Sequence, residues 1–387
     1  MTNRERFLCI CHGEKPDYIP IFGIPGAAGI SGGVMRPVYD RLLAMGMPDV
    51  GGAHELDGSI TNLEGWCRFF GVCGPIGCEF PGKEPKPIAF EKRVEGEYEY
   101  LTYETGALTR QVVNNSVTYS MPEFIKFHVR DWESWEYYKN RFAPTDPYSP
   151  EQLDALASKF DNRTEPLSIH ITSTFGVFRN LVGPETAFTL FYDDPDLVRD
   201  ILGWFHDNER RFKYPLVKRL KPDMVGGWED MCCKHGMLIS PEMFNDFCAP
   251  AYREAADVAR EAGVALFTVD SDGYTEALLP VLEALGVNGL HPWEVKAGNE
   301  LARVREKHPE FILLGGIEKE ILNAGNRGLI YPEIMGKVPP MIAKGRYFPN
   351  FDHGLQPLLD YENMLAAMTL LHEVLENPEG EFPRAYI

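Results

Sequence analysis

Acidic and histidine side chains directly follow short apolar runs in the second half of the chain. Five successive runs end in such groups: Glu229 and Asp230, then Asp270 and Asp272, then His291 and Glu294, then Glu318, and finally Asp352 and His353. Any one group, taken singly, is also typical of a turn or a helix cap. Carboxylates brought together repel, so some must stay protonated with a raised pKa, or a cation must lie among them. The first arrangement gives general acids, and the second gives a site for zinc, manganese or magnesium.

The apolar runs that carry these groups alternate with segments of helical character. The strand-like runs cover residues 167–173, 223–230, 265–273, 287–294, 311–320 and 346–354. Two helices have clear starts, at Asp194-Pro195 and Ser240-Pro241, because each pairs a capping residue with proline at the first helical position. This alternation predicts parallel βαβ units, and six or more of them favour a (β/α)8 TIM barrel. In such a barrel the reactive groups lie at the carboxyl ends of the strands.

The first 160 residues are less regular. Residues 18–23 predict a first strand, and residues 85–130 alternate in a way that predicts a β-hairpin insertion. Proline and glycine clusters at 72–87 and 143–150 indicate loops, but no segment is long enough to be a linker between domains. We therefore predict a single barrel domain over residues 1–387, with the hairpin as an insertion.

The composition limits the classes of partner. The net charge of −19 argues against nucleic acid, an anionic membrane surface, or a strongly anionic substrate without a concentrated group of cations. No apolar run approaches the roughly 20 residues that span a bilayer. The N-terminal segment lacks the zones of a signal peptide, so we expect a cytoplasmic protein.

Several familiar site motifs are incomplete. Asp270-x-Asp272-Gly273 partly follows a calcium loop, but Leu279 stands where that loop needs glutamate, and a strand precedes it. The chain has no G-x-G-x-x-G after a strand and no G-x-S-x-G. Its eight cysteines form no pair of C-x-x-C motifs, and most of them are expected to be small buried residues. His170 fits either the barrel interior or a core position, and Lys234 and Arg346 are the nearest cations to the predicted site in the sequence.

Over essentially its whole length the chain resembles the uroporphyrinogen decarboxylase superfamily. The resemblance lies in RERFLCICHGEKPDYIPIF near the start, in DDPDLVRDIL, in W-E-D followed by K-x-G-x-L-I-S-P-E-M-F, in GVNGLHPWE, and in GRYFPNFDHG. It implies a distorted (β/α)8 barrel with its cavity at the carboxyl ends of the strands. Its members are mainly porphyrinogen decarboxylases and cobalamin-dependent methyltransferases.

Two departures narrow the activity that the resemblance implies. Decarboxylases of this superfamily carry an arginine-rich loop after the first strand, whereas residues 22–29 read FGIPGAAG. Methyltransferases that act on thiols bind zinc through His-x-Cys-Gly and a later cysteine. Here Asp270-x-Asp272-Gly273 and Asp352-His353-Gly354 take those places, so the thiolate ligands are absent.

The resemblance therefore favours a methyltransferase that moves a methyl group from a small donor, such as a methoxylated aromatic, to a corrinoid (cobalamin) carried by a partner protein. The predicted catalytic residues are Glu229, Asp270, His291 and Glu294. The predicted metal ligands, for zinc or another divalent ion, are Asp270, Asp272 and His353. The predicted substrate-binding residues are Phe22, Phe175, Trp228, Trp293 and Tyr274, some of which fit the barrel core equally well.

Two other functions remain open at this point. One is decarboxylation of a small carboxylic acid or a porphyrinogen-like substrate, which requires cations that converge on the cavity. The other is a ligand-binding barrel without catalysis, which requires neither a metal nor Asp270 and Glu229. The sequence also leaves a homodimer open.

Overall fold

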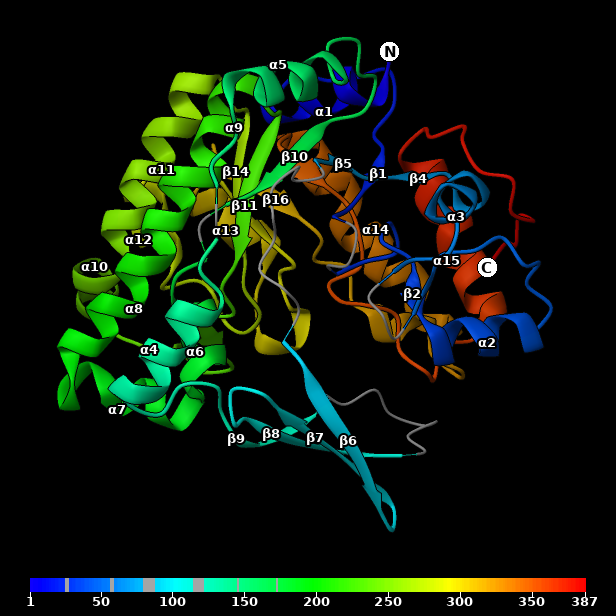
Figure 1. Cartoon of the computed structure of the whole chain (residues 1–387). Coiled ribbons are helices and arrows are strands. Elements are labelled where there is room, and N and C mark those ends of the chain that lie inside the picture. Colours follow the sequence, from blue (N-terminus) through cyan, green and yellow to red (C-terminus); the bar gives the residue numbers. More distant parts are fainter. Residues whose placement is uncertain (25–27, 56–58, 79–87, 114–121, 145, 172) are drawn as a thin grey trace.

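The computed structural model describes residues 1–24, 28–55, 59–78, 88–113, 122–144, 146–171 and 173–387. Seven parallel strands form the main sheet (Figure 1). In spatial order they are β17 (Tyr347–Phe348), β16 (Ile312–Leu314), β15 (Gly289–His291), β14 (Leu266–Asp270), β11 (Met224–Trp228), β10 (Leu167–His170) and β5 (Ile76–Gly77). The six predicted strands from residue 167 onward are all present, but each ends before its polar tip or within it.

The sheet curls into a distorted (β/α)8 barrel. Strand β1 (Ile21–Phe22) pairs in parallel with β4 (Val72–Cys73), and β4 precedes β5 so closely that the two segments share one strand position. Asn350 then bridges β17 to β1, because its Nδ2 donates to Phe22 O at 3.1 Å while its Oδ1 accepts from Ile30 N at 3.0 Å. The prediction of a distorted TIM barrel is confirmed, with side chains closing the gap between first and last strands.

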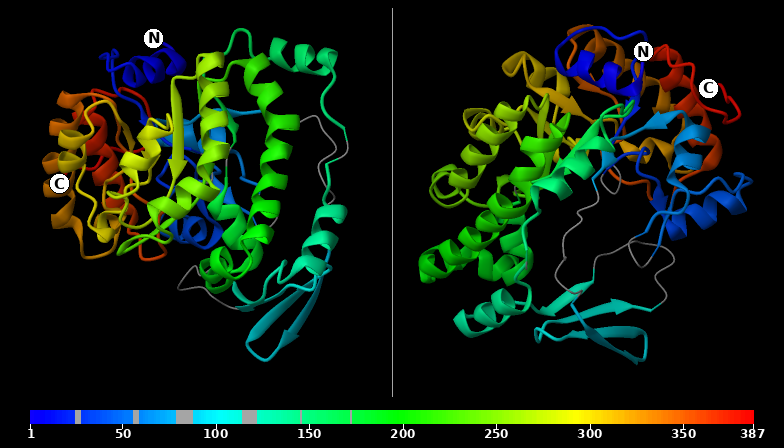
Figure 2. Two further views of the ribbon diagram at one scale, coloured as in Figure 1. Left: turned by 90° about the vertical axis from the view of Figure 1, so that its left-hand side faces the viewer. Right: turned by 45° about the horizontal axis from the view of Figure 1, so that its top comes forward.

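Helices cover the outside of the barrel (Figures 1 and 2). They are α1 (Asn3–Cys11), α2 (Arg36–Ala44), α3 (Leu63–Phe70), α4 (Trp132–Arg141), α5 (Pro150–Ser158), α6 (Phe175–Val182), α7 (Pro184–Asp193), α8 (Pro195–Asn208), α9 (Tyr214–Leu220), α10 (Pro241–Phe247), α11 (Ala249–Ala262), α12 (Leu279–Ala284), α13 (Leu301–Lys307), α14 (Arg327–Lys344) and α15 (Tyr361–Val374). A π-helical segment, η1 (Glu209–Lys213), joins α8 to α9, and the 3-10 segments η2 (Val295–Ala297) and η3 (Lys319–Leu322) follow β15 and β16.

The two predicted helix starts are confirmed. The Asp194 side chain accepts a hydrogen bond from Leu197 N at 3.1 Å, and Ser240 Oγ accepts one from Met243 N at 3.1 Å. The helix that begins after Ser240 is shorter than its apolar spacing predicts, because the chain divides into α10 and α11 at Cys248. Pro250, in the first turn of α11, has no N–H for a hydrogen bond to the preceding turn, so the helix is interrupted there.

Strands within residues 90–112 and 123–126 form a separate four-stranded antiparallel sheet where we predicted a hairpin insertion. Its strands lie in the order β6 (Phe90–Glu95), β7 (Tyr98–Tyr103), β8 (Leu108–Val112) and β9 (Glu123–Lys126). The sheet projects from the side of the barrel toward which the main strands point (Figures 1 and 2). Two short pairs complete the described strands: β2 (Val34–Met35) with β3 (Ala53–His54), and β12 (Cys232–Cys233) with β13 (Gly236–Met237).

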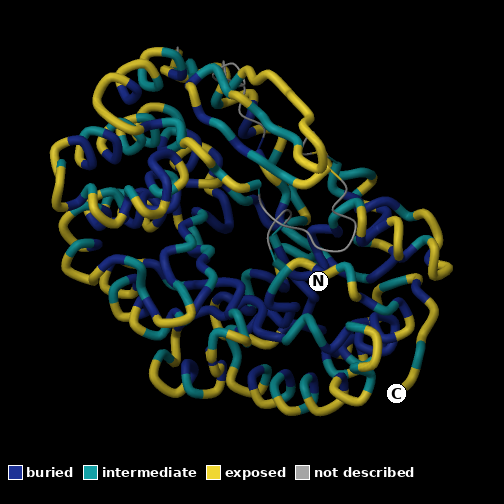
Figure 3. Tube along the Cα trace, turned by 90° about the horizontal axis from the view of Figure 1, so that it is seen from below, coloured by how far each residue is buried: buried dark blue, intermediate teal, exposed yellow. Residues whose placement is uncertain are grey.

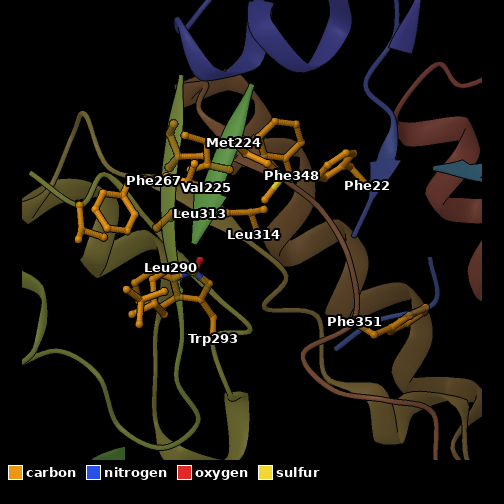
Figure 4. Close-up of a cluster of buried hydrophobic side chains, with 14 of the residues drawn as sticks. Phe22, Met224, Val225, Phe267, Leu290, Trp293, Leu313, Leu314, Phe348 and Phe351 are labelled. Carbon is orange, nitrogen blue, oxygen red and sulfur yellow. The ribbon is translucent and has the colours of Figure 1, made fainter. Parts of the chain in front are cut away.

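One hydrophobic cluster fills the barrel and extends under the helices. Figure 3 shows buried chain inside and exposed chain along the outer helices and the small sheet. In Figure 4 the side chains of Phe22, Val225, Leu313 and Phe348 lie within this cluster. Among the described residues, no helix combines the length and the apolar content needed to cross a membrane.

Candidate active site

A cavity of about 410 Å³ opens among four adjacent strands of the barrel. The residues that line it are Ile24, Ser168, His170, Met224, Gly226, Gly227, Trp228, Thr268, Asp270 and His291. Its polar groups gather at the carboxyl ends of β10, β11, β14 and β15, since Trp228, Asp270 and His291 are opposite one another in the strand register. None of the described lining residues is lysine or arginine. The cavity therefore has an apolar wall and a polar wall of carboxyl, imidazole and hydroxyl groups.

Asp270 and His291 form the central pair of the cavity. Oδ2 of Asp270 lies 3.6 Å from Nε2 of His291, and Nδ1 of His291 lies 3.2 Å from Thr268 Oγ1. The imidazole is nearly buried and Asp270 is half-buried, so the pair is shielded but still reaches the cavity. A carboxyl and an imidazole in this arrangement can pass a proton to or from a bound molecule.

His170 faces the same cavity from β10. Its Nε2 lies 3.2 Å from Ser173 Oγ, and Ser173 Oγ accepts a hydrogen bond from Trp228 N at 3.2 Å. The ring is exposed to the cavity but enclosed by the barrel wall, and this burial lowers the pKa of His170 to about 4. His170 is therefore neutral at physiological pH and can act as a hydrogen-bond partner. The structure thus decides between the two positions that the sequence left open for it.

Three carboxylates lie at the rim beside this cavity. Ligand oxygens of Asp230, Asp270 and Asp272 all lie within 4.8 Å of one another. The loop backbone helps to hold them, because Asp272 N donates to Asp230 Oδ1 at 3.1 Å. Burial, together with the charges of Asp272 and Asp270, raises the pKa of Asp230. Oxygen donors at this spacing suit a hard divalent ion such as magnesium or manganese, and zinc less well.

Two cations flank the three carboxylates. Nε2 of His353 lies 3.1 Å from Asp272 Oδ1, while Arg179 lies 3.5 Å from Asp230 Oδ2 and also donates to the Asp230 carbonyl at 2.6 Å. Burial alone would lower the pKa of His353, but its contacts with Asp272 and the buried Asp352 raise it to about 10. The repulsion within the cluster is therefore already partly offset by groups of the protein.

The predicted metal set is not the one that the structure brings together. Among the described residues, the group of three candidate ligands consists of Asp230, Asp270 and Asp272, so Asp230 takes the place that we predicted for His353. His353 contacts Asp272 as an ion-pair partner, and its imidazolium form has no free electron pair for a metal.

Glu229, predicted as a catalytic residue, is placed in the interior and does not line the cavity. Its side chain is completely buried and accepts four hydrogen bonds, from Thr174 N (2.7 Å), Thr174 Oγ1 (2.8 Å), Gly176 N (2.7 Å) and Tyr252 Oη (2.6 Å). Two of these donors are backbone groups at the start of α6. Burial raises the pKa of Glu229. We assign this carboxylate to holding α6 against β11.

The predicted aromatic binding residues separate into three groups. Trp228 lines the cavity. Phe22, Phe175 and Trp293 are fully buried in the hydrophobic cluster, where Phe22 packs against Phe348 at 5.3 Å and Trp293 donates its indole N–H to Leu290 O (Figure 4). Tyr274 points away from the cavity, toward Glu276 and Arg303. Among the five, Trp228 alone is placed to contact a ligand in the cavity.

The Glu294 side chain stabilises the loop that follows β14. Its Oε2 accepts a hydrogen bond from Gly273 N at 2.8 Å, and Asn299 connects its carbonyl to that of Gly273. Glu294 thus fixes the turn that carries Asp272. The two cations named from the sequence lie elsewhere: Lys234 is exposed on the β12–β13 turn, and Arg346 binds the Cys11 carbonyl and Glu310 at the amino end of the barrel.

The fold and the site define this protein as a TIM-barrel protein with an acid–imidazole cavity at the carboxyl ends of its strands. The family model of uroporphyrinogen decarboxylase (URO-D) matches residues 115–374, and the chain belongs to that family. A search of curated proteins finds no match.

Two solved structures resemble the fold. A protein described as a methyltransferase from Methanosarcina mazei is similar over 97% of this chain and 98% of its own, with a TM-score of 0.55 and 14% identity. A D-tagatose 3-epimerase-like protein covers 59% of this chain and 84% of its own at 14% identity, and its TM-score of 0.34 is too low to support an argument.

Proposed function

We propose that this protein is a methyltransferase that moves a methyl group from a small donor, such as a methoxylated aromatic, to a corrinoid carried by a partner protein. Membership of the URO-D family and a fold shared with a protein described as a methyltransferase support the class. The observation that carries the proposal is the cavity itself, where Trp228 offers an aromatic wall beside the Asp270–His291 pair.

The cavity suits a small donor. Its volume of about 410 Å³ is at the lower end of the range of small-molecule sites, which is about 300–1,000 Å³. The apolar wall, with Ile24 and Met224, can hold a ring while Trp228 stacks on it. Asp270 and His291 can then supply a proton to the oxygen that leaves when its methyl group is removed. The corrinoid, when its partner delivers it, supplies the nucleophile that accepts the methyl group.

Decarboxylation of a polycarboxylic substrate has less support. Such a substrate needs several permanent cations in the cavity, and none of the described lining residues is lysine or arginine. Nearby cations are occupied by carboxylates: Arg179 by Asp230, His353 by Asp272, and Lys213 by Glu209 at 2.9 Å.

A divalent metal is a second way to assist the departing oxygen. Asp230, Asp270 and Asp272 would hold it, and it would act as a Lewis acid beside the cavity. Equilibrium dialysis of chelator-treated protein against magnesium, manganese and zinc, one at a time, tests this. Absence of binding, with unaltered activity in Asp272→Asn, would reject the metal version and leave the acid version.

Methyl transfer itself is tested with a reduced, cobalt(I) corrinoid protein and a panel of methoxylated compounds, followed by the absorbance change on corrinoid methylation. We expect turnover with at least one donor, and a rate reduced about 100-fold or more in Asp270→Asn, since a positioned proton donor contributes about 10²–10⁴-fold. Tyr274→Phe is the matched control, because its hydroxyl lies outside the cavity and its loss should change the rate less than about twofold. A flat trace across a broad panel would contradict the proposal, as would an Asp270→Asn rate equal to that of the control.

A further inference from the structure

Strand β6 forms one edge of the small sheet. Among the described residues it pairs with β7 alone, and all six of its side chains are exposed. Two of them are apolar, and Phe90 and Val94 are 55% and 54% exposed. An edge strand of this length with exposed apolar residues is a template for pairing with another strand.

The backbone groups that are free for such pairing can be identified from the register. The first pair in the register is Phe90 opposite Tyr103, and one step before it Glu104 N donates to Ala89 O at 2.8 Å. Hydrogen-bonded positions alternate along an antiparallel pair, so the N–H and C=O groups of Glu91, Arg93 and Glu95 face β7. Those of the intervening residues, Phe90, Lys92 and Val94, point outward from the edge.

We propose that β6 pairs antiparallel with β6 of a second copy of this chain, about a two-fold axis at Lys92, and so joins two small sheets into one. In this register Phe90 lies opposite Val94 of the partner subunit, and Glu91 lies opposite Arg93 of the partner subunit. Each contact occurs twice because of the symmetry. Two pairs of exposed apolar residues are covered, and two pairs of opposite charge meet at the close, non-hydrogen-bonded positions.

The two nearest registers that keep the free backbone groups opposite one another, each shifted by two residues, are repulsive. A shift by two residues in one direction places Glu91 opposite Glu95 and Arg93 opposite itself. The same shift in the other direction places Glu91 opposite itself and Phe90 opposite Lys92. Charged edge residues often prevent strand pairing, but here their order disfavours both of these registers and favours the one with its axis at Lys92.

The remaining charges agree with this arrangement. Lys92 would lie on the axis, but its ammonium group is already paired with Glu99 of β7 in the same chain. Arg93 stacks over Tyr100 at 5.0 Å and pairs with Glu95 at 2.9 Å, which keeps its guanidinium on the face shared with Glu91. The seam is much smaller than the roughly 1,600 Å² of a standard interface, so the dimer should dissociate on dilution.

Sedimentation velocity from about 1 µM to about 500 µM, a range in which small interfaces dissociate, tests the proposal. Wild type should shift from monomer to dimer with concentration. Glu91→Arg and Arg93→Glu each create two like-charge contacts, so each variant alone should dimerise at least about 10-fold more weakly. An equimolar mixture of the two variants restores opposite charges at both contacts and should form a heterodimer, and the double variant should dimerise with itself. Glu97→Arg, a matched charge change in the exposed β6–β7 turn, should leave dimerisation unchanged.

A monomeric wild type at the highest concentration would overturn the proposal, as would single variants that dimerise like wild type or a mixture that stays monomeric. A monomeric wild type whose β6 edge instead binds the corrinoid protein would assign the edge to that partner. Circular dichroism of each variant shows that the fold is intact, and these exposed positions should not change it. The outcome is independent of the methyl-transfer assay.

Discussion

Replacement of Glu229 by alanine should remove a large share of the free energy of unfolding. Two of the donors to its carboxylate are the backbone N–H groups of Thr174 and Gly176, which cannot rotate toward another acceptor. Each buried donor left without a partner costs about 1–3 kcal/mol, and truncation of a buried, fully bonded charged group costs about 3–5 kcal/mol in total. We expect a loss of about 3–5 kcal/mol, against the 5–15 kcal/mol typical of a folded domain.

Urea denaturation followed by far-UV circular dichroism measures this loss as a lower midpoint at an unchanged slope. Tyr252→Phe removes one of the four hydrogen bonds and should cost about 1 kcal/mol. Asp230→Asn is the control, because it changes the neighbouring carboxylate, which is half-buried among like charges. It should stay within about 0.5 kcal/mol of wild type or be slightly more stable.

Loss of activity without loss of stability in Glu229→Ala would contradict the structural role that we assign to Glu229. If Glu229→Ala unfolds at the wild-type urea midpoint while its methyl transfer is lost, the carboxylate acts in the reaction and not in holding α6. The reasoning from burial and hydrogen bonding would then be refuted.

The remaining predictions concern pH and packing. The pKa of His170 in the folded protein, about 4, lies below its ordinary value of 6.5. The free energy of unfolding should therefore keep its full value above pH 6.5 and fall as the pH drops toward 4. His170→Gln should reduce this acid sensitivity. Urea denaturation of wild type and variant at pH 7.5 and at pH 4.5 measures it, and an equal loss of unfolding free energy in both proteins would contradict the prediction. Gly226→Ala should destabilise by about 1–3 kcal/mol, because its Cβ would lie 2.3 Å from Thr268 O. Gly203→Ala, in an exposed turn of α8 with open space, should instead stabilise by about 0.5–1 kcal/mol, and the reverse order of the two would contradict the packing argument.

The strand tips were predictable because they follow from periodicity. A buried parallel strand is a continuous apolar run, and its loop begins where the run meets polar residues. This places Asp270, Asp272 and His291 at one edge of the barrel, and the structure brings the first two together and the third beside Asp270. The capping pairs at residues 194 and 240 were equally predictable, because a cap is a local interaction.

The direction of each side chain at a tip was not predictable. Glu229 and Asp230 are adjacent in the sequence, yet one is buried beneath α6 and the other joins the acidic cluster. At the end of a strand the regular alternation of sides stops, and Asp230 has a positive φ of 45°. A positive φ is set by the surrounding loop, and single-sequence patterns carry little signal for it at a residue other than glycine.

The positions of the aromatic residues and of the cations could not be inferred from the sequence, for a related reason. Trp293 follows a strand tip and looks available in the sequence, but tertiary packing buries it and satisfies its indole N–H. Arg179 lies on α6, 51 residues before Asp230 in the sequence, and contacts Asp230 because the start of α6 packs against the end of β11. Contacts between distant elements depend on the assembled barrel, which the spacing of residues along one strand does not encode.

The charges around the acidic cluster favour a proton over a metal ion as the aid to the leaving oxygen. Asp230, Asp270 and Asp272 offer at most three negative charges, and Arg179 and His353 supply two positive ones, with His353 shared with Asp352. One proton bound to the cluster brings its net charge close to zero, and the raised pKa of Asp230 favours binding of such a proton. A divalent ion would leave about one net positive charge on these three carboxylates and two cations, unless the Asp352 carboxylate or loss of the His353 proton offset it. Metal binding to this site should therefore be weak below neutral pH, whereas the protonated cluster requires no change in the flanking cations.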